Sequence, residues 1–142
     1  MRHHLVVLHR RYLDQLLDGR KRVECRFSKI KRPPYEAVAP GDLLWLKLPS
    51  GPVEAVARAA ECRFQALRSG EDVRRIQRAH GDAISAPDEF YVEAASWARY
   101  CTLIWIETVL AIRPMTVYKP DQRAWAVLGR APRPGMRVVC AS

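Results

Sequence analysis

The sequence predicts an α+β protein, a small closed or nearly closed β-barrel of about six strands with one early short helix and a helical insertion. Six to eight short segments have strand composition, and Pro or Gly separates them. Two stretches with helical spacing interrupt them, one after the first strand and one at about residues 65–100. Short antiparallel strands protect their edges by closing. The length of 142 residues fits a single domain, residues 1–142.

The first elements follow directly from the order of apolar residues. "HHLVVLHR" is a short apolar run that predicts a buried strand, and "RRYLDQLLDG" carries its apolar residues at helical spacing. Gly19 stands where a helix end favours a left-handed residue. "KRVECRF" then alternates, with Val23, Cys25 and Phe27 on one face and charged residues on the other. We therefore expect a strand, a short helix and a second strand.

The middle of the chain predicts a loop and a hairpin. "SKIKRPPYEAVAPGD" is rich in Pro and Lys and ends in the turn Pro40-Gly41-Asp42, which favours a surface loop. "LLWLKL" and "VEAVARAAECRF" are two strand candidates joined by a turn at "PSG". Lys47 and Trp45 share one face of the first of these strands, and we expect that face to turn toward a cleft.

The insertion and the C-terminal part complete the predicted barrel. Val73 and Ile76 fall at helical spacing opposite an arginine-rich solvated face, and a second helix begins at Pro87-Asp88. Four further strand candidates follow: "CTLIWIETVLAI", "MTVYK", "WAVL" and "MRVVC". Trp97, Trp105 and Trp125 are expected in the core, as aromatic residues at regular spacing usually are.

The net charge of +9 is concentrated at the two ends of the chain. Residues 1–32 carry ten Lys and Arg against three Asp and Glu, and residues 119–142 carry five against one. The part between them, residues 33–118, has a net charge of −2. If the ends are neighbours in the fold, they form one electropositive surface that attracts polyanions such as nucleic acid. An arginine-rich composition that only reflects the base composition of the genome is the alternative.

Composition and cysteine spacing exclude several classes. No apolar run reaches the length of a membrane span, and no secretory signal is recognisable at the N-terminus, so a cytoplasmic protein with no membrane partner is predicted. The four cysteines show no zinc-type spacing and are expected to be buried, reduced thiols. His3, His4 and His9 are interpreted as core or surface residues, so no metal and no cofactor is expected.

Gly19, Lys21, Glu24 and Arg26 reproduce the spacing Gly-x-Lys-x-x-Glu-x-Arg. This pattern, followed by the Gly-Asp turn at residues 41–42, resembles the signature of the ASCH domain (activating signal cointegrator homology), a branch of the PUA-like β-barrel superfamily. The resemblance covers most of residues 3–118. It implies a PUA-like barrel with a cleft lined by the motif, in a superfamily devoted largely to RNA and modified nucleotides.

The resemblance also implies an enzymatic alternative. Some small bacterial relatives are amidohydrolases on acetylated cytidine, which use a Lys and a Thr of the motif with a Glu from elsewhere. Lys21 is kept here, but Glu24 stands in place of the Thr, which argues against that mechanism. Other relatives are metal-dependent ribonucleases whose catalytic residues do not map cleanly onto this chain. If the protein is an enzyme, Lys21 and Glu24 are the candidate catalytic residues.

The chemistry of the motif favours recognition of a base. Glu24 and Arg26 project from one strand face, and Lys21 is placed to bend over Glu24. A carboxylate between two cations stays ionised and can accept hydrogen bonds from a base, while Arg26 contacts a phosphate or stacks on a base. An exposed salt bridge at the strand edge is the structural alternative. The predicted nucleic-acid-binding residues are Lys21, Glu24, Arg26, Lys29, Lys31, Arg32, Tyr35 and Lys47.

Three functions remain open at this point. The first is a monomeric module that binds nucleic acid, RNA above all. The second is an enzyme acting on modified nucleosides or RNA. The third is a cleft for a nucleotide-like small molecule.

Overall fold

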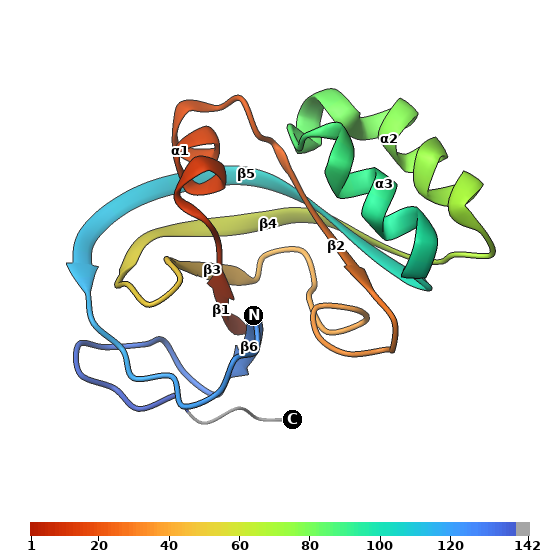
Figure 1. Ribbon diagram of the computed structural model, residues 1–142. Coiled ribbons are helices and arrows are strands. Elements are labelled where there is room, and N and C mark those ends of the chain that lie inside the picture. Colours follow the sequence, from red (N-terminus) through yellow and green to blue (C-terminus); the bar gives the residue numbers. More distant parts are fainter. Residues whose placement is uncertain (139–142) are drawn as a thin grey trace.

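The computed structural model describes residues 1–138, and its centre is one strongly curled six-stranded sheet (Figure 1). The strand order is β2-β5-β4-β3-β1-β6, and all neighbouring pairs are antiparallel except β1 with β3. The strands are β1 (His3–Val7), β2 (Val23–Ser28), β3 (Leu43–Lys47), β4 (Val53–Ala66), β5 (Tyr100–Met115) and β6 (Trp125–Leu128). The helices are α1 (Arg10–Asp18), α2 (Gly70–Ile84) and α3 (Asp88–Trp97).

The curl comes from the long antiparallel pair β4 and β5. Their register shifts at three places between Val53 and Glu61, and such bulges increase the local twist and bend of a strand. The sheet therefore wraps into a half-barrel whose two edges are β2 and β6. The predicted α+β class with about six strands, an early helix and a helical insertion is confirmed. Closure by strand pairing is not reached among residues 1–138, where the strand order is open at β2 and β6.

Helix α1 covers the inside of the curl. Leu13 and Leu16 are buried and pack with Leu44, Leu46 and Ile104 of the sheet in one apolar cluster. Gly19 ends the helix at φ 85°, the left-handed conformation that the sequence predicts there. The chain then turns directly into β2, which places the motif at the edge of the sheet.

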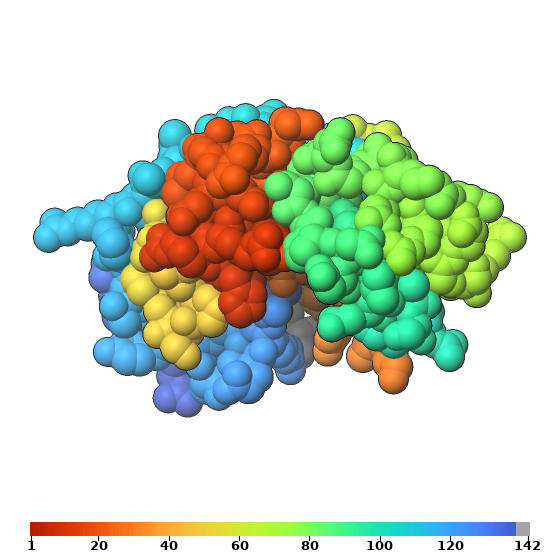
Figure 2. Space-filling view, turned by 45° about the horizontal axis from the view of Figure 1, so that its top comes forward, coloured from red at the N-terminus to blue at the C-terminus, as the bar shows by residue number. Residues whose placement is uncertain are grey.

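The helical insertion covers the end of the sheet at β2. Val73 and Ile76 of α2 and Tyr91 of α3 are buried with Val23 and Leu103 in a second apolar cluster. In the space-filling view the insertion (green) lies directly against the N-terminal part of the chain (red and orange) (Figure 2). The insertion is therefore part of the same packed unit as the motif. It runs from residue 70 to 97, slightly shorter than the predicted 65–100, because β4 and β5 extend further.

The two ends of the chain are neighbours in the fold. β1 pairs antiparallel with β6, from His3 opposite Leu128 to Val6 opposite Trp125. The segments predicted as strands "MTVYK" and "MRVVC" are different in the structure. Met115 ends β5, and within residues 1–138 an isolated parallel bridge joins Tyr118 to Arg137. The prediction for residues 139–140 lies outside the described residues.

Two groups of side-chain predictions have mixed outcomes. Trp125 is buried as predicted and Trp105 is partly buried, but Trp97 is 41% exposed, so its placement in the core is wrong. It is the last residue of α3, beyond Tyr91 and Ala94, the buried residues of that helix. Cys25 and Cys101 are buried free thiols, Cys62 is a half-buried free thiol, and Cys140 lies outside the described residues.

Over residues 1–138, none of the helices combines the length and the apolar character that crossing a membrane requires.

We expect Gly19→Ala to lower the free energy of unfolding by about 1 kcal/mol, because a side chain disfavours the left-handed conformation at φ 85°. A Cβ at Gly19 meets no atom within 4 Å, so backbone strain is the only cost. Gly129→Ala is the matched control, since Gly129 also has open space but no positive φ. Urea unfolding of both variants measures the difference. Equal stability of the two variants contradicts the proposed role of Gly19.

Candidate functional site

The motif is held between α1 and the end of α2. The backbone N–H of Lys21 donates to the Gln15 carbonyl of α1 at 3.0 Å. The next residue, Arg22, donates its N–H to the Ala83 carbonyl of α2 at 2.8 Å. These two bonds fix the turn between Gly19 and β2, so that Lys21 is directed inward and is 3% exposed.

The Glu24 carboxylate is the centre of the site. Glu24 is only 6% exposed, and its Oε1 accepts the Cys25 N–H at 3.0 Å. Lys21 Nζ lies 3.6 Å from Oε1, and Arg26 Nη2 lies 3.5 Å from Oε2. Burial alone would raise the pKa of Glu24, but the charges of Lys21 and Arg26 together with the Cys25 N–H hold the pKa below its ordinary value. The carboxylate is therefore ionised although it is buried.

Both cations use their N–H groups elsewhere. Lys21 Nζ donates to the Ile84 carbonyl at 2.7 Å, at the C-terminal end of α2. Arg26 Nη2 donates to the Val7 carbonyl at 3.0 Å, across the opening between β2 and β1. As a result, Glu24 Oε2 is a buried carboxylate oxygen without a hydrogen-bond donor in the described structure. Such an oxygen is costly to bury, and a further N–H donor would offset that cost.

A cavity of about 380 Å³ opens beside this carboxylate, and we call it the inner cavity. Its size lies within the usual range of small-ligand sites. Lys21, Glu24 and Arg26 supply its charged groups. The rest of the lining is largely apolar or aromatic and includes Leu8, Tyr12, Pro49, Ile84, Ala86 and Phe90.

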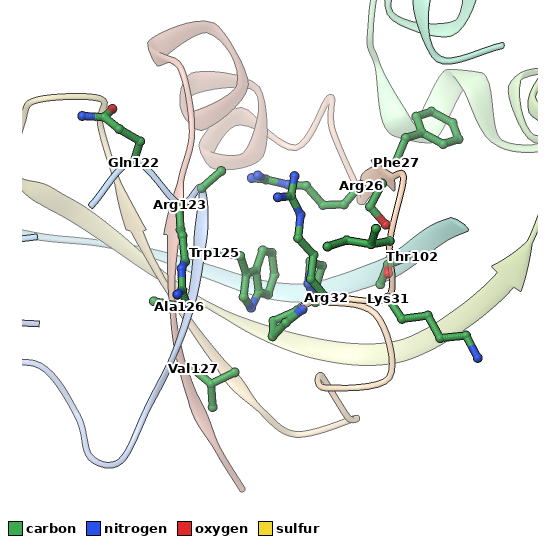
Figure 3. A pocket seen from close by; sticks show the side chains of 15 residues that line it. Arg26, Phe27, Lys31, Arg32, Thr102, Gln122, Arg123, Trp125, Ala126 and Val127 are labelled. Carbon is green, nitrogen blue, oxygen red and sulfur yellow. The ribbon is translucent and has the colours of Figure 1, made fainter. Parts of the chain in front are cut away.

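A second cavity of about 560 Å³ lies between the two sheet edges, and we call it the outer cavity. It adjoins the inner cavity, since Arg26 and Ala124 line both. Arg26 and Arg32 extend into this space, whereas Lys31 points away from it (Figure 3). The Arg26 guanidinium stands over the Trp125 ring, 5.4 Å from its centroid. The outer cavity therefore combines cationic groups from both ends of the chain with one aromatic face.

A buried hydrogen-bond chain fixes Trp125. Its Nε1–H donates to His4 Nδ1 at 2.9 Å, so the other ring nitrogen of His4 carries the proton and donates to Asp42 at 2.8 Å. Asp42 also accepts the N–H groups of Arg2 and Ala39. Burial lowers the pKa of His4, although the neighbouring Asp42 opposes this effect, and His4 is therefore neutral. The Gly-Asp turn at residues 41–42 thus positions Trp125, which gives the outer cavity its aromatic face.

The structure brings together only part of the predicted site. Lys21, Glu24 and Arg26 converge, and Lys31 and Arg32 border the outer cavity, with the side chain of Arg32 directed into it and that of Lys31 directed away. Lys29 is exposed in the same loop, while Tyr35 packs on Phe64 and Tyr100. Lys47 lines neither the inner nor the outer cavity, but a separate cavity.

Sequence reasoning missed other lining residues. The sequence predicts Trp125 only in the core and does not single out Arg123, Tyr12 or Phe90 as site residues, although all four line the cavities. The positive charge of the C-terminal part was the available signal for Arg123. The Ile84 carbonyl that holds Lys21 carries no signal of its own in the sequence. Within residues 1–138, there is no cluster of three or more His, Cys, Asp or Glu side chains that could hold a metal ion.

Comparison with solved structures identifies the fold. The chain superposes on the crystal structure of ASCH from Zymomonas mobilis with a TM-score of 0.62 at 18% identity, over 79% of this chain and 71% of that one. Two mutants of the same protein give TM-scores of 0.62 and 0.63 at 17% identity, over 80% and 81% of this chain and 72% and 76% of theirs. No family model and no curated protein matches the sequence. The chain therefore has the fold of an ASCH domain, as the motif predicts.

We expect the free energy of unfolding to fall as the pH drops below about 6.5, the ordinary pKa of histidine. Unfolded His4 then takes up a proton, which folded His4 cannot do without losing its bond from Trp125. The loss is at most about 1.4 kcal/mol for each pH unit. Urea unfolding at about pH 7.5 and about pH 5.5 measures it.

His4→Gln should make this loss smaller, and His9→Gln should leave it unchanged, because His9 is exposed. Trp125→Phe removes the N–H donor and should also reduce the loss. An identical pH dependence in wild type and His4→Gln contradicts the assignment of neutral His4.

Proposed function

We propose that the protein binds single-stranded nucleic acid, RNA in preference to DNA, and that the inner cavity receives one base beside Glu24. The observation that carries this proposal is the Glu24 carboxylate, which is buried, ionised and has one oxygen without a hydrogen-bond donor. A ligand with an N–H group satisfies that oxygen, and an anionic ligand does not. The inner cavity therefore favours a neutral group that donates hydrogen bonds.

A nucleobase fits these requirements. Exocyclic amino groups and ring N–H groups donate to carboxylates, as cytosine N4 does to Glu or Asp. The apolar and aromatic lining around Tyr12 and Phe90 suits the faces of a flat ring. Lys21 and Arg26 keep the carboxylate ionised, so it acts as an acceptor only.

The outer cavity suits the adjoining nucleotide. Arg26, Arg32 and Arg123 line it, and guanidinium groups bind phosphate through two N–H groups at once. Trp125 adds an aromatic face on which a base can stack, an interaction of about 1 to 3 kcal/mol per base. Lys29 and Lys31 add positive charge on the exposed loop. A nucleic-acid strand that places one base in the inner cavity therefore has its phosphate backbone next to this cationic surface.

The preference for RNA is supported by the fold. The ASCH-type fold belongs, by the resemblance described above, to a superfamily devoted largely to RNA and modified nucleotides. Unpaired bases are accessible in single-stranded RNA, and a site that takes one base needs such a base. A nucleotide-like small molecule would use the same inner cavity. Binding of nucleosides without binding of polymer would favour that partner.

Hydrolysis is the second candidate, because Lys21 and Glu24 line the same cavity 3.6 Å apart. A general base or nucleophile needs a free lone pair. Lys21 Nζ instead donates a hydrogen bond to the Ile84 carbonyl and forms an ion pair with Glu24. We therefore favour binding over catalysis. Incubation with acetylcytidine and with labelled RNA decides between them: turnover that is lost in Lys21→Ala would establish the enzyme.

Arg26→Ala should weaken binding to single-stranded RNA of any sequence by about tenfold, because it removes a charged contact shared by both cavities. Arg75→Ala is the matched control: Arg75 is an exposed arginine on α2 and should have little effect. Mobility shifts at two salt concentrations, the lower about 50 mM, measure both variants. If the wild type gives no mobility shift at about 50 mM salt, the proposal is wrong. Circular dichroism of Arg26→Ala checks whether the variant is folded.

Glu24→Gln should reduce the preference of the protein among bases and leave the salt dependence of binding nearly unchanged. The amide keeps the shape of the side chain but loses the charged acceptor, which costs about 1 to 3 kcal/mol for the preferred base. Phosphate contacts, which set the salt slope, remain. Homopolymer titrations at several salt concentrations test this. An unchanged base preference shows that Glu24 does not contact the base.

A further inference from the structure

Lys47 is a buried cation outside the site described above. It is only 7% exposed, at the end of β3, where the register with β4 shifts. Its Nζ donates to the Leu48 carbonyl at 3.0 Å. No carboxylate lies within ion-pair distance of Nζ among residues 1–138. A lysine that is so far buried normally has a charged partner.

Lys47 lines a cavity of about 530 Å³, which we call the lysine cavity. The turn between β3 and β4 forms one wall, with Ser50 and Gly51, and residues 116–120 form another. Lys119 and Arg137 contribute two more cations to the lining. No acidic residue of the described part of the chain lines it.

The two C-terminal cations are held in place by the fold. Tyr118 donates its N–H to the Met136 carbonyl at 2.8 Å, and Val138 donates to the Tyr118 carbonyl at 2.7 Å. These bonds fix Arg137 beside the segment that carries Lys119. Lys119 Nζ forms an ion pair with Asp121 at 2.9 Å, which offsets one of the three positive charges. The lysine cavity therefore has a net positive lining that is built by long-range contacts.

The electrostatics of the lysine cavity favour an anion. Burial lowers the pKa of Lys47, and the charge of Lys119 lowers it further, so both effects disfavour the ammonium group that the cavity presents. A bound anion would offset both effects. Lysine binds phosphate as a compact charge with three N–H donors, and Nζ of Lys47 donates to the Leu48 carbonyl within the described residues. The hydroxyls of Ser50 and Thr116 are further donors in the lining.

We propose that the lysine cavity is a phosphoryl-binding site in which Lys47, Lys119 and Arg137 hold the anion. The site is separate from the inner and outer cavities and does not depend on base recognition by Glu24. Its phosphoryl group comes either from the backbone of a bound nucleic acid or from a phosphorylated small molecule. The chemistry that the cavity recognises is the same in both cases.

The test is a titration of the isotope-labelled full chain, followed by amide NMR signals of Gly51, Thr116 and Lys119. One arm adds inorganic phosphate and the other adds single-stranded RNA, and both keep the ionic strength constant with chloride. We expect at least one of the two probes to shift these signals in a saturable way. Lys47→Met and Arg137→Met should each weaken that binding by about tenfold or more, as loss of a charged hydrogen bond does.

Both variants are expected to fold. Met replaces the buried lysine with an apolar side chain of similar shape, a change that is often neutral or stabilising, and Arg137 is exposed. Arg68→Met is the matched control, because Arg68 is an exposed cation in the loop before α2, at the other end of the molecule (Figure 1). It should bind both probes as the wild type does.

Each outcome either supports or overturns the proposed phosphoryl site. Saturable shifts with phosphate that Lys47→Met weakens support the site, and similar shifts with RNA identify the backbone as a source. Shifts with phosphate alone identify a small phosphorylated ligand. Unchanged signals with both probes, or shifts that Lys47→Met retains, overturn the proposal. Base recognition is unaffected by either result, because Glu24→Gln tests it independently.

Discussion

The buried carboxylate of Glu24 imposes a constraint that organises the elements around it. A carboxylate at this depth loses several kcal/mol of hydration, so it requires nearby cations. Lys21 and Arg26 provide them, and each cation also binds a carbonyl of another element. Lys21 reaches Ile84 at the end of α2, and Arg26 reaches Val7 of β1. The short motif thus ties the helical insertion and the far part of the sheet to the edge strand β2.

The same contacts that stabilise the fold also prepare the site. Arg26 spans the opening of the half-barrel and stands over Trp125, whose position depends on His4 and Asp42. The gap between the edges of the sheet consequently remains a lined cavity and does not collapse. The pairing of β1 with β6 brings the positive charge of the two chain ends to this gap. The same network of contacts therefore stabilises the fold and shapes the proposed binding site.

The features that could be predicted from the sequence are those set by a pattern over a few neighbouring residues. Gly19, the alternation of β2 and the contact of Lys21 with Glu24 follow from spacing and charge over a few residues. What it could not predict depends on distant contacts. The Ile84 carbonyl and the hydrogen bond from Trp125 to His4 join residues far apart in the chain. The exposure of Trp97 and the location of Lys47 depend on where the elements end and which segments cover them. The cytoplasmic location and the monomeric state stay predictions.

The central claim is that Glu24 Oε2, which is ion-paired with Arg26 but has no hydrogen-bond donor in the described structure, accepts an N–H group of a base. Carbon-detected NMR of the Glu24 side-chain carboxyl during titration with single-stranded RNA tests it most directly. The account predicts a saturable shift of this carboxyl signal, with the carboxylate still ionised and with the affinity that the mobility shift gives. RNA binding that leaves the Glu24 carboxyl signal unchanged would contradict the account and place recognition on the basic surface alone.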